Sequence, residues 1–153
     1  MAESHVLPLR VYYEDTDAAG MVYYANYLRF AERGRTEMLR AHGLDHKRLL
    51  AEDGIVFTVR ACQLEFLSPA RLDDRLDVVT RITTLRGASI DLEQLVRRGE
   101  TALVRLGVKI ACVGRDGRPA RVPSAVARAL APVTVTPSLS RKIGPNGKRE
   151  ADG

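Results

Sequence analysis

The sequence has no long apolar run, no leader-like start and few cysteines, and each absence excludes a class of protein. None of its apolar stretches approaches the roughly 18 residues that a membrane-spanning helix needs. The first ten residues, MAESHVLPLR, lack the basic start and apolar stretch of a secretory signal, so we expect no leader. Cys62 and Cys112 are far apart in strand-like segments, which predicts two buried, reduced thiols and favours a cytoplasmic protein.

Motifs for nucleic acids, nucleotides and metals are also missing. The 24 basic residues outnumber the 19 acidic ones, but they occur without zinc-finger spacings, RNP aromatics or basic heptads. We therefore expect no nucleic-acid partner and interpret most of the charge as solvated surface. No P-loop, G-x-G-x-x-G or G-x-S-x-G motif occurs. His42 and His46 have no third ligand nearby, and the segment from Asp15 to Asn26 lacks the glutamate that closes a calcium loop, so we expect no metal.

The composition is that of one globular domain. The chain has 153 residues, of which 45% are hydrophobic and 28% charged, enough for a core without disulfides. Apolar periodicity ends near residue 131. We expect one domain over residues 1–131 and a flexible basic tail over residues 132–153.

One long helix is predicted, over residues 26–41. Its apolar positions recur on one side at the spacing of a helix: Tyr27, Phe30, Ala31, Gly34 and Met38. Asn26 is expected to cap the N-terminus and Gly43 to follow the last turn. A glycine inside a helix costs about 1 kcal/mol relative to alanine, so Gly34 suggests that the helix lies close against a flat sheet.

The remaining regular structure is predicted to be strand. We expect strands over residues 7–13, 55–66, 75–85, 88–98 and 101–113, and a short helix over 123–131 with Pro123 at its first position. Long strands joined by short turns indicate an antiparallel, strongly curved sheet. The predicted fold class is α+β, with the curved sheet wrapped around one central helix.

The residues with most chemical potential lie in the loop before the long helix. Asp15 and Asp17 stand in a glycine-containing segment with tyrosines on both sides. This combination suits a carboxylate held beside a helix N-terminus, where free N–H groups can polarise a carbonyl. The alternative is that both aspartates only form Asx turns that lead into the helix.

A family resemblance adds to this interpretation. The segment V-Y-Y-E-D-T-D-A-A-G-M-V-Y-Y-A-N-Y, followed by F-A-E-R-G-R-T-E-M-L, resembles the YbgC-type acyl-CoA thioesterases of the 4-hydroxybenzoyl-CoA thioesterase class, which have the hotdog fold. V-R-A-C-Q-L-E-F-L-S-P-A-R-L-D-D and T-L-R-G-A-S extend the resemblance over about residues 6–130. It implies hydrolysis of an acyl- or aroyl-CoA to the free acid and coenzyme A, without a metal or redox cofactor, in a homodimer or homotetramer.

The resemblance also implies roles for single residues. It places the catalytic carboxylate at Asp17, as nucleophile or general base, and the N–H that polarises the thioester oxygen at Tyr24. Many YbgC-type proteins have histidine where this chain has Tyr24, so any side-chain role differs here. Tyr13 is expected to flank the substrate, together with Val59 and Arg60 from a partner subunit.

Arg86 and Ser89, in the R-G-A-S turn, are expected to meet the phosphates of coenzyme A. For each of these flanking residues the alternative is sheet packing or a solvated charge.

Two other functions stay open at this stage. The first is a hydratase or dehydratase acting on acyl thioesters, a related hotdog chemistry that usually needs a histidine. The three histidines, His5, His42 and His46, all lie outside the loop. The second is an interaction protein, because YbgC-type proteins are associated with the Tol–Pal envelope system and with phospholipid-synthesis proteins.

Overall fold

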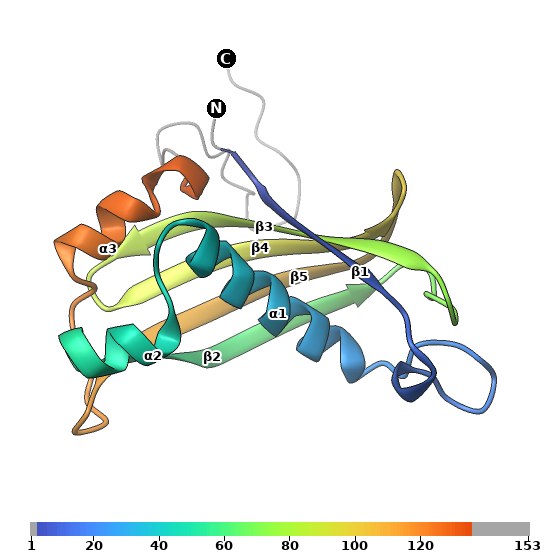
Figure 1. Ribbon diagram of the computed structural model, residues 1–153, viewed down its shortest axis with the longest axis horizontal. Coiled ribbons are helices and arrows are strands. Elements are labelled where there is room, and N and C mark those ends of the chain that lie inside the picture. Colours follow the sequence, from blue (N-terminus) through green and yellow to red (C-terminus); the bar gives the residue numbers. More distant parts are fainter. Residues whose placement is uncertain (1–2, 136–153) are drawn as a thin grey trace, which may run out of the picture.

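A five-stranded antiparallel sheet curves around one long helix in the computed structural model, which describes residues 3–135 (Figure 1). The strands are β1 (His5–Arg10), β2 (Ile55–Phe66), β3 (Arg75–Arg86), β4 (Ser89–Arg98) and β5 (Thr101–Gly114). Their order in the sheet is β1-β3-β4-β5-β2, so β1 and β2 form its edges. The α-helices are α1 (Asn26–Ala41), α2 (His46–Arg48) and α3 (Ser124–Ala129). Two 3-10 turns, η1 (Tyr13–Asp15) and η3 (Ala131–Val133), and one π-helical segment, η2 (Leu49–Asp53), complete the helical elements. This arrangement confirms the predicted α+β class.

Most of the predicted elements are confirmed, but the first strand is shorter than expected. Helix α1 and strand β2 have the predicted bounds. Strand β1 ends at Arg10, and Tyr13 begins the turn η1 instead of ending a strand. The reason is local, because the carboxylate of Asp15 accepts a hydrogen bond from the N–H of Tyr12 at 2.8 Å and folds the chain back.

The starts of two helices also differ from the prediction. The N-cap of α1 is Ala25, and Asn26, the expected cap, is the first helical residue. The Asn26 side chain donates instead to the carbonyl oxygen of Asp15, at 2.9 Å. Pro123 is the N-cap of α3 and not its first helical residue.

Helix α1 lies close against the sheet, as Gly34 predicted. It contacts β1, β3 and β4 through its apolar side. A Cβ atom at Gly34 would lie 2.6 Å from Cγ1 of Val78, a distance that real side chains do not tolerate. Beside it, the buried Gln94 side chain donates from Nε2 to the carbonyl of Ala31 and to Oγ1 of Thr80, both at 2.9 Å. These bonds join the helix backbone directly to β3 and β4.

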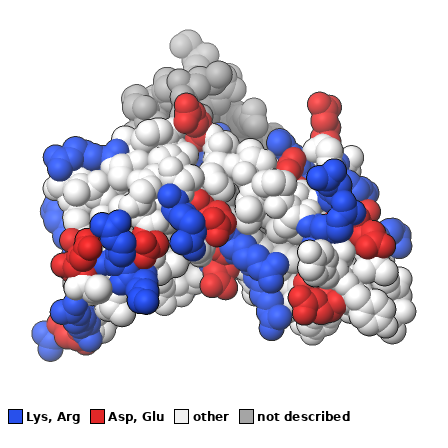
Figure 2. Space-filling view, viewed as in Figure 1, with Lys and Arg blue, Asp and Glu red and all other residues white. Residues whose placement is uncertain are grey.

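The end of the described chain packs on the sheet. Residues 132–135 were expected to begin the tail, but Val133 is buried and the N–H of Val135 donates to the carbonyl of Ile82 at 2.8 Å. The rest of the expected tail, 136–153, lies outside the described residues. Figure 2 shows basic and acidic side chains intermixed over the face that carries α1, which agrees with a solvated charge.

Two further observations concern compartment and membranes. Both cysteines are free; Cys112 is buried as expected, whereas Cys62 is only half-buried because it belongs to the edge strand β2. Among the helices that the structure describes, none is long and apolar enough to cross a membrane.

Candidate active site

The loop before α1 is anchored to the segment that follows β2. The N–H of Val22 donates to the carbonyl of Ala70 at 2.9 Å, and the N–H of Leu72 donates to the carbonyl of Gly20 at 3.0 Å. The hydroxyl of Tyr27, on α1, accepts a hydrogen bond from the N–H of Ala70 at 3.0 Å. The loop is therefore held between the helix and residues 70–72.

Asp15 has a structural role within this loop. It is buried, and its carboxylate accepts the bond from Tyr12 described above. Its carbonyl oxygen accepts from the N–H of Tyr23, at 3.0 Å, and from the side chain of Asn26. The Asp15 side chain bonds to a residue three positions back, so it forms no Asx turn, but it organises the backbone and has little access to a ligand. The Asx turn of the alternative interpretation is found at Asp17, whose carboxylate accepts from the N–H two residues on.

Asp17 is exposed, and only one of its two carboxylate oxygens accepts hydrogen bonds from the described residues. Its Oδ1 accepts hydrogen bonds from the N–H groups of Ala19, at 2.8 Å, and Met21, at 3.2 Å. Its own N–H donates to the carbonyl of Met21 at 2.8 Å. Within residues 3–135, Oδ2 has no hydrogen-bond partner. The carboxylate is therefore fixed in orientation while one of its oxygens stays free to react.

Tyr24 directly precedes the N-cap of α1 and presents a free backbone donor. From Asn26 onward the N–H groups of the first turn bond to carbonyls three residues back. No acceptor for the N–H of Tyr24 is found in the part of the chain that the structure describes. A free N–H at a helix N-terminus can stabilise negative charge on a carbonyl oxygen.

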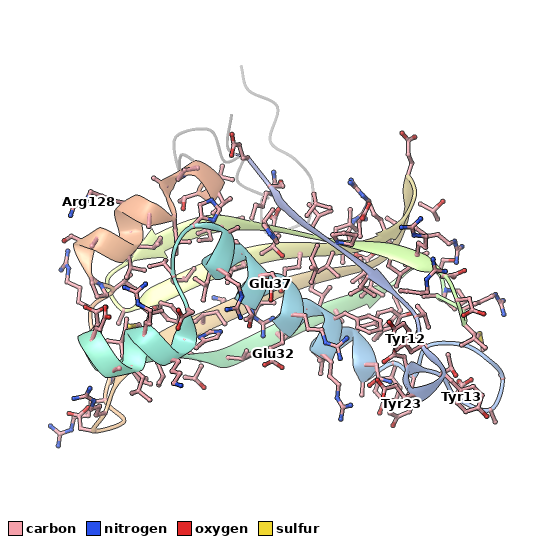
Figure 3. All side chains as sticks on the ribbon, viewed as in Figure 1. Tyr12, Tyr13, Tyr23, Glu32, Glu37 and Arg128 are labelled. Carbon is pink, nitrogen blue, oxygen red and sulfur yellow. The ribbon has the colours of Figure 1, made fainter. Side chains whose placement is uncertain are left out.

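Tyrosines surround this loop at one end of the molecule (Figure 3). Tyr13 is 83% exposed and Tyr24 is 62% exposed. The rings of Tyr23 and Tyr24 lie 4.8 Å apart between centroids. The neighbouring Tyr24 hydroxyl raises the pKa of Tyr23 above its ordinary value.

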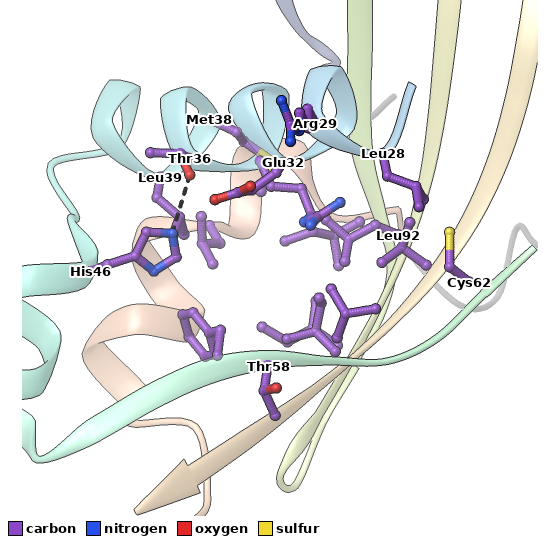
Figure 4. Close-up of a pocket in the computed structure, with 18 residues that line it drawn as sticks. Leu28, Arg29, Glu32, Thr36, Met38, Leu39, His46, Thr58, Cys62 and Leu92 are labelled. Atoms are coloured by element: carbon purple, nitrogen blue, oxygen red, sulfur yellow. Dashed lines mark hydrogen bonds between the residues drawn. The ribbon is translucent and has the colours of Figure 1, made fainter. Parts of the chain in front are cut away.

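A cavity of about 500 Å³ lies between α1 and the inner face of the sheet (Figure 4). It begins at Leu28, one helical turn beyond Tyr24, and extends to His46, whose ring bonds to the hydroxyl of Thr36 at 3.2 Å. Most of its wall is apolar and comes from α1, β2, β4 and β5. Its size is that of ordinary small-molecule sites.

Comparison with known proteins identifies the family. The family model of the thioesterase-like superfamily matches residues 11–130. The chain belongs to the thioesterase-like superfamily. Among curated members, "Acyl-CoA thioester hydrolase YbgC" of Escherichia coli O6:H1 is 48% identical over 107 residues, covering 69% of this chain and 79% of the relative. "Acyl-CoA thioesterase YbgC" of Haemophilus influenzae is 45% identical over 106 residues, covering 69% and 78%.

Solved structures of the thioesterase-like superfamily agree. A probable thioesterase from Bartonella henselae is 41% identical, with a TM-score of 0.77 over 79% of this chain and 100% of that one. A 4-hydroxybenzoyl-CoA thioesterase mutant complexed with 4-hydroxybenzoyl-CoA is 25% identical, with a TM-score of 0.78 over 85% and 100%. The expected hotdog fold and the expected thioester-hydrolysing enzyme are confirmed. The role of each residue stays a prediction.

The structure brings some of the predicted site residues together. Tyr13, Asp17 and Tyr24 belong to one loop region at the start of α1. Val59 and Arg60 lie exposed on the edge strand β2, and Val59 also lines the cavity.

Arg86 and Ser89 are far from this loop. They face each other across the β3–β4 turn, at the opposite end of the sheet from the loop (Figure 1). Arg75, at the other end of β3, is eleven residues away, or about 36 Å along an extended strand. The predicted contact of Arg86 and Ser89 with the substrate at Asp17 therefore requires a second subunit.

Two residues of the cavity wall were not anticipated. Arg35 and Cys62 both line the cavity. The signal for Arg35 was its place one turn after Ala31, beside the apolar side of α1, where a charged side chain is unusual. Nothing in the sequence distinguished Cys62 from a core thiol.

Proposed function

We propose that this chain hydrolyses acyl-CoA thioesters at the loop before α1, with Asp17 as the reacting carboxylate. The observation that carries the proposal is the pairing of two free groups in one loop. Oδ2 of Asp17 is available to react, and the N–H of Tyr24 is available to bind the thioester oxygen. In support, the curated relatives act on acyl-CoA thioesters by name, and the solved 4-hydroxybenzoyl-CoA thioesterase mutant holds such a thioester.

Both routes open to Asp17 use the same geometry. As a nucleophile, Oδ2 attacks the thioester carbon, the C–S bond breaks, and coenzyme A leaves as a thiolate; water then hydrolyses the mixed anhydride. As a general base, Asp17 takes a proton from the water that attacks the same carbon. Negative charge develops on the carbonyl oxygen in either route, and the N–H of Tyr24 stabilises it.

The test is coenzyme A release, followed with a thiol reagent over short, long and aromatic acyl-CoAs. Asp17→Asn keeps an oxygen for the N–H groups of Ala19 and Met21, so we expect an unchanged melting temperature and a fall in kcat/KM of about 100-fold or more. Glu14→Gln is the matched control in the same exposed turn and should keep full activity. Tyr24→Phe should stay within a few-fold of the wild type, because the backbone N–H survives. Equal activity of Asp17→Asn and the wild type refutes the assignment of Asp17.

A homodimer or homotetramer is part of the same proposal. Strand β2 is a twelve-residue edge strand with exposed apolar side chains, among them Val56, Val59 and Phe66. Unpaired edges of this length and character attract a second strand. Pairing two β2 strands brings Val59 and Arg60 of one subunit toward the other, as predicted from the resemblance.

A cytoplasmic location also belongs to the proposal and is supported by the two free cysteines. Association with Tol–Pal or phospholipid-synthesis proteins stays a prediction from the resemblance.

A further inference from the structure

The cavity begins near the reacting groups and continues along α1. Its wall on the helix extends from Leu28 to Leu39, eleven residues, or about 16 Å. Leu28 lies one turn after Tyr24, and Val59, the predicted substrate-flanking residue, is on the opposite wall. An acyl group whose carbonyl is bound by the N–H of Tyr24 can therefore extend directly into this space.

Three charged side chains of α1 line the cavity, and of these Arg35 is half-buried whereas Arg29 and Glu32 are exposed. Nη1 of Arg35 donates to Oε1 of Gln94 at 3.0 Å, and Gln94 is itself fixed by its bonds to Ala31 and Thr80. Burial lowers the pKa of Arg35, with the charge of Glu32 acting in the opposite direction. The guanidinium is thus partly desolvated and held in one orientation.

Within residues 3–135, the remaining donors of Arg35 have no acceptor. Among the described residues its guanidinium forms a single hydrogen bond and no ion pair within 4.0 Å. Its other nitrogens are not sealed from solvent, and Arg35 is one of the residues that line the cavity. A guanidinium only donates hydrogen bonds, and in an apolar pocket it gains most from a charged or strongly polar oxygen.

We propose that Arg35 selects acyl groups that carry an oxygen acceptor at their distal end, with the acyl chain filling the cavity beneath α1. This inference rests on the proposed thioesterase function and names its substrate class: acyl-CoAs with a terminal carboxylate or hydroxyl. Arg35 lies nine positions after Asn26, the first helical residue, and the arginine side chain leans back toward the helix start, leaving about 10 Å to span. With bonds of about 1.5 Å in a zigzag, about eight carbons cover that distance.

The experiment compares three acyl-CoAs of equal length: octanoyl-CoA, octanedioyl-CoA and 8-hydroxyoctanoyl-CoA. Each is assayed with the wild type, with Arg35→Met and with the control Arg33→Met, which removes an exposed arginine outside the cavity on the same helix. We expect the wild type to favour at least one oxygenated substrate over octanoyl-CoA by about tenfold or more in kcat/KM. Arg35→Met should bring the ratio of the oxygenated substrates to octanoyl-CoA close to one, and Arg33→Met should retain the preference. The two oxygenated substrates distinguish a carboxylate from a hydroxyl.

A second measurement does not depend on turnover or on a variant. The thiol of Cys62 lines the same cavity, and burial raises its pKa, with Arg35 opposing this shift. Octanedioic acid or 8-hydroxyoctanoic acid should slow the alkylation of Cys62 in the wild type more than octanoic acid does at equal concentration.

The possible failures are separable. Equal turnover of the three substrates by the wild type, or an equal loss of all three in Arg35→Met, overturns the role of Arg35 and leaves the thioesterase function standing. If no acyl-CoA is hydrolysed, the proposed function fails as well. If Arg35→Met does not fold, equal protection of Cys62 by the three acids overturns the inference.

Discussion

Replacing Gly34 by alanine should destabilise the protein, although alanine is the better helix former. The helix itself would gain about 1 kcal/mol from the change. Against this, the new Cβ would lie 2.6 Å from Cγ1 of Val78 and 3.1 Å from both Oγ1 of Thr80 and Nε2 of Gln94. None of these groups can move easily, because Val78 is fully buried and β-branched while Thr80 and Gln94 are hydrogen-bonded to each other.

The magnitude follows from these opposing effects. Overpacking a core costs about 1–3 kcal/mol, and overlap with three fixed neighbours places this site near the upper value. After subtracting the helix gain, we expect a net loss of about 2 kcal/mol in the free energy of unfolding. For a domain of this size that corresponds to a fall of about 4–8 °C in Tm. Urea denaturation and thermal melting measure both quantities.

Two controls make the result specific to the helix–sheet contact. Gly107 is exposed on β5, and a Cβ there would meet nothing within 4 Å, so Gly107→Ala should be neutral or stabilising by up to about 1 kcal/mol. Adding Val78→Ala to Gly34→Ala removes the closest clash, so the double variant should lose less than the sum of the single losses, by about 1 kcal/mol. A Gly34→Ala protein as stable as the wild type would show that the helix can shift without cost, and the close-approach argument would be wrong.

Two further predictions concern the edge strand and the support of the loop. Analytical sedimentation should show the wild type as a dimer or tetramer. Val59→Lys on β2 should dissociate it, whereas Val6→Lys on the other edge strand should leave the oligomer intact. A monomeric wild type would contradict the proposed pairing. Partial burial opposes ionisation of Asp74, but hydrogen bonds from the Arg71 N–H and the Arg98 guanidinium hold the pKa of its carboxyl below the ordinary value. The ionised Asp74 carboxylate therefore stabilises the folded protein at pH values above the ordinary carboxyl pKa, and this stabilisation is lost as the pH falls through the lowered pKa of Asp74. Arg98→Met should therefore lower the free energy of unfolding at neutral pH by up to about 1 kcal/mol and make that free energy fall less steeply as the pH decreases. Urea titrations at several pH values measure this, and the same pH dependence in the variant and the wild type would refute it.

The sequence by itself determined the local elements and the position of the reactive loop. Helix α1 and strand β2 have the predicted bounds because the spacing of apolar residues along a chain records which face of an element is buried. Gly34 even indicated how closely the helix would approach the sheet. The capping details failed where a neighbour offered a better partner, as at Asn26, whose side chain bonds to Asp15 instead of to its own helix.

Only the tertiary structure separated residues of the same type by their surroundings. Asp15 and Asp17 are the same residue type two positions apart, yet one is buried by its bond to Tyr12 and the other keeps a free oxygen. The cavity depends on strand order, because α1 packs mainly on β1, β3 and β4 while β2 pairs with β5 at the far edge of the sheet. Arg35 lines that space. The spacing of apolar residues shows that one face of α1 is buried. The side chains that cover this face come from strands distant in the sequence, and these strands meet the helix only in the folded protein.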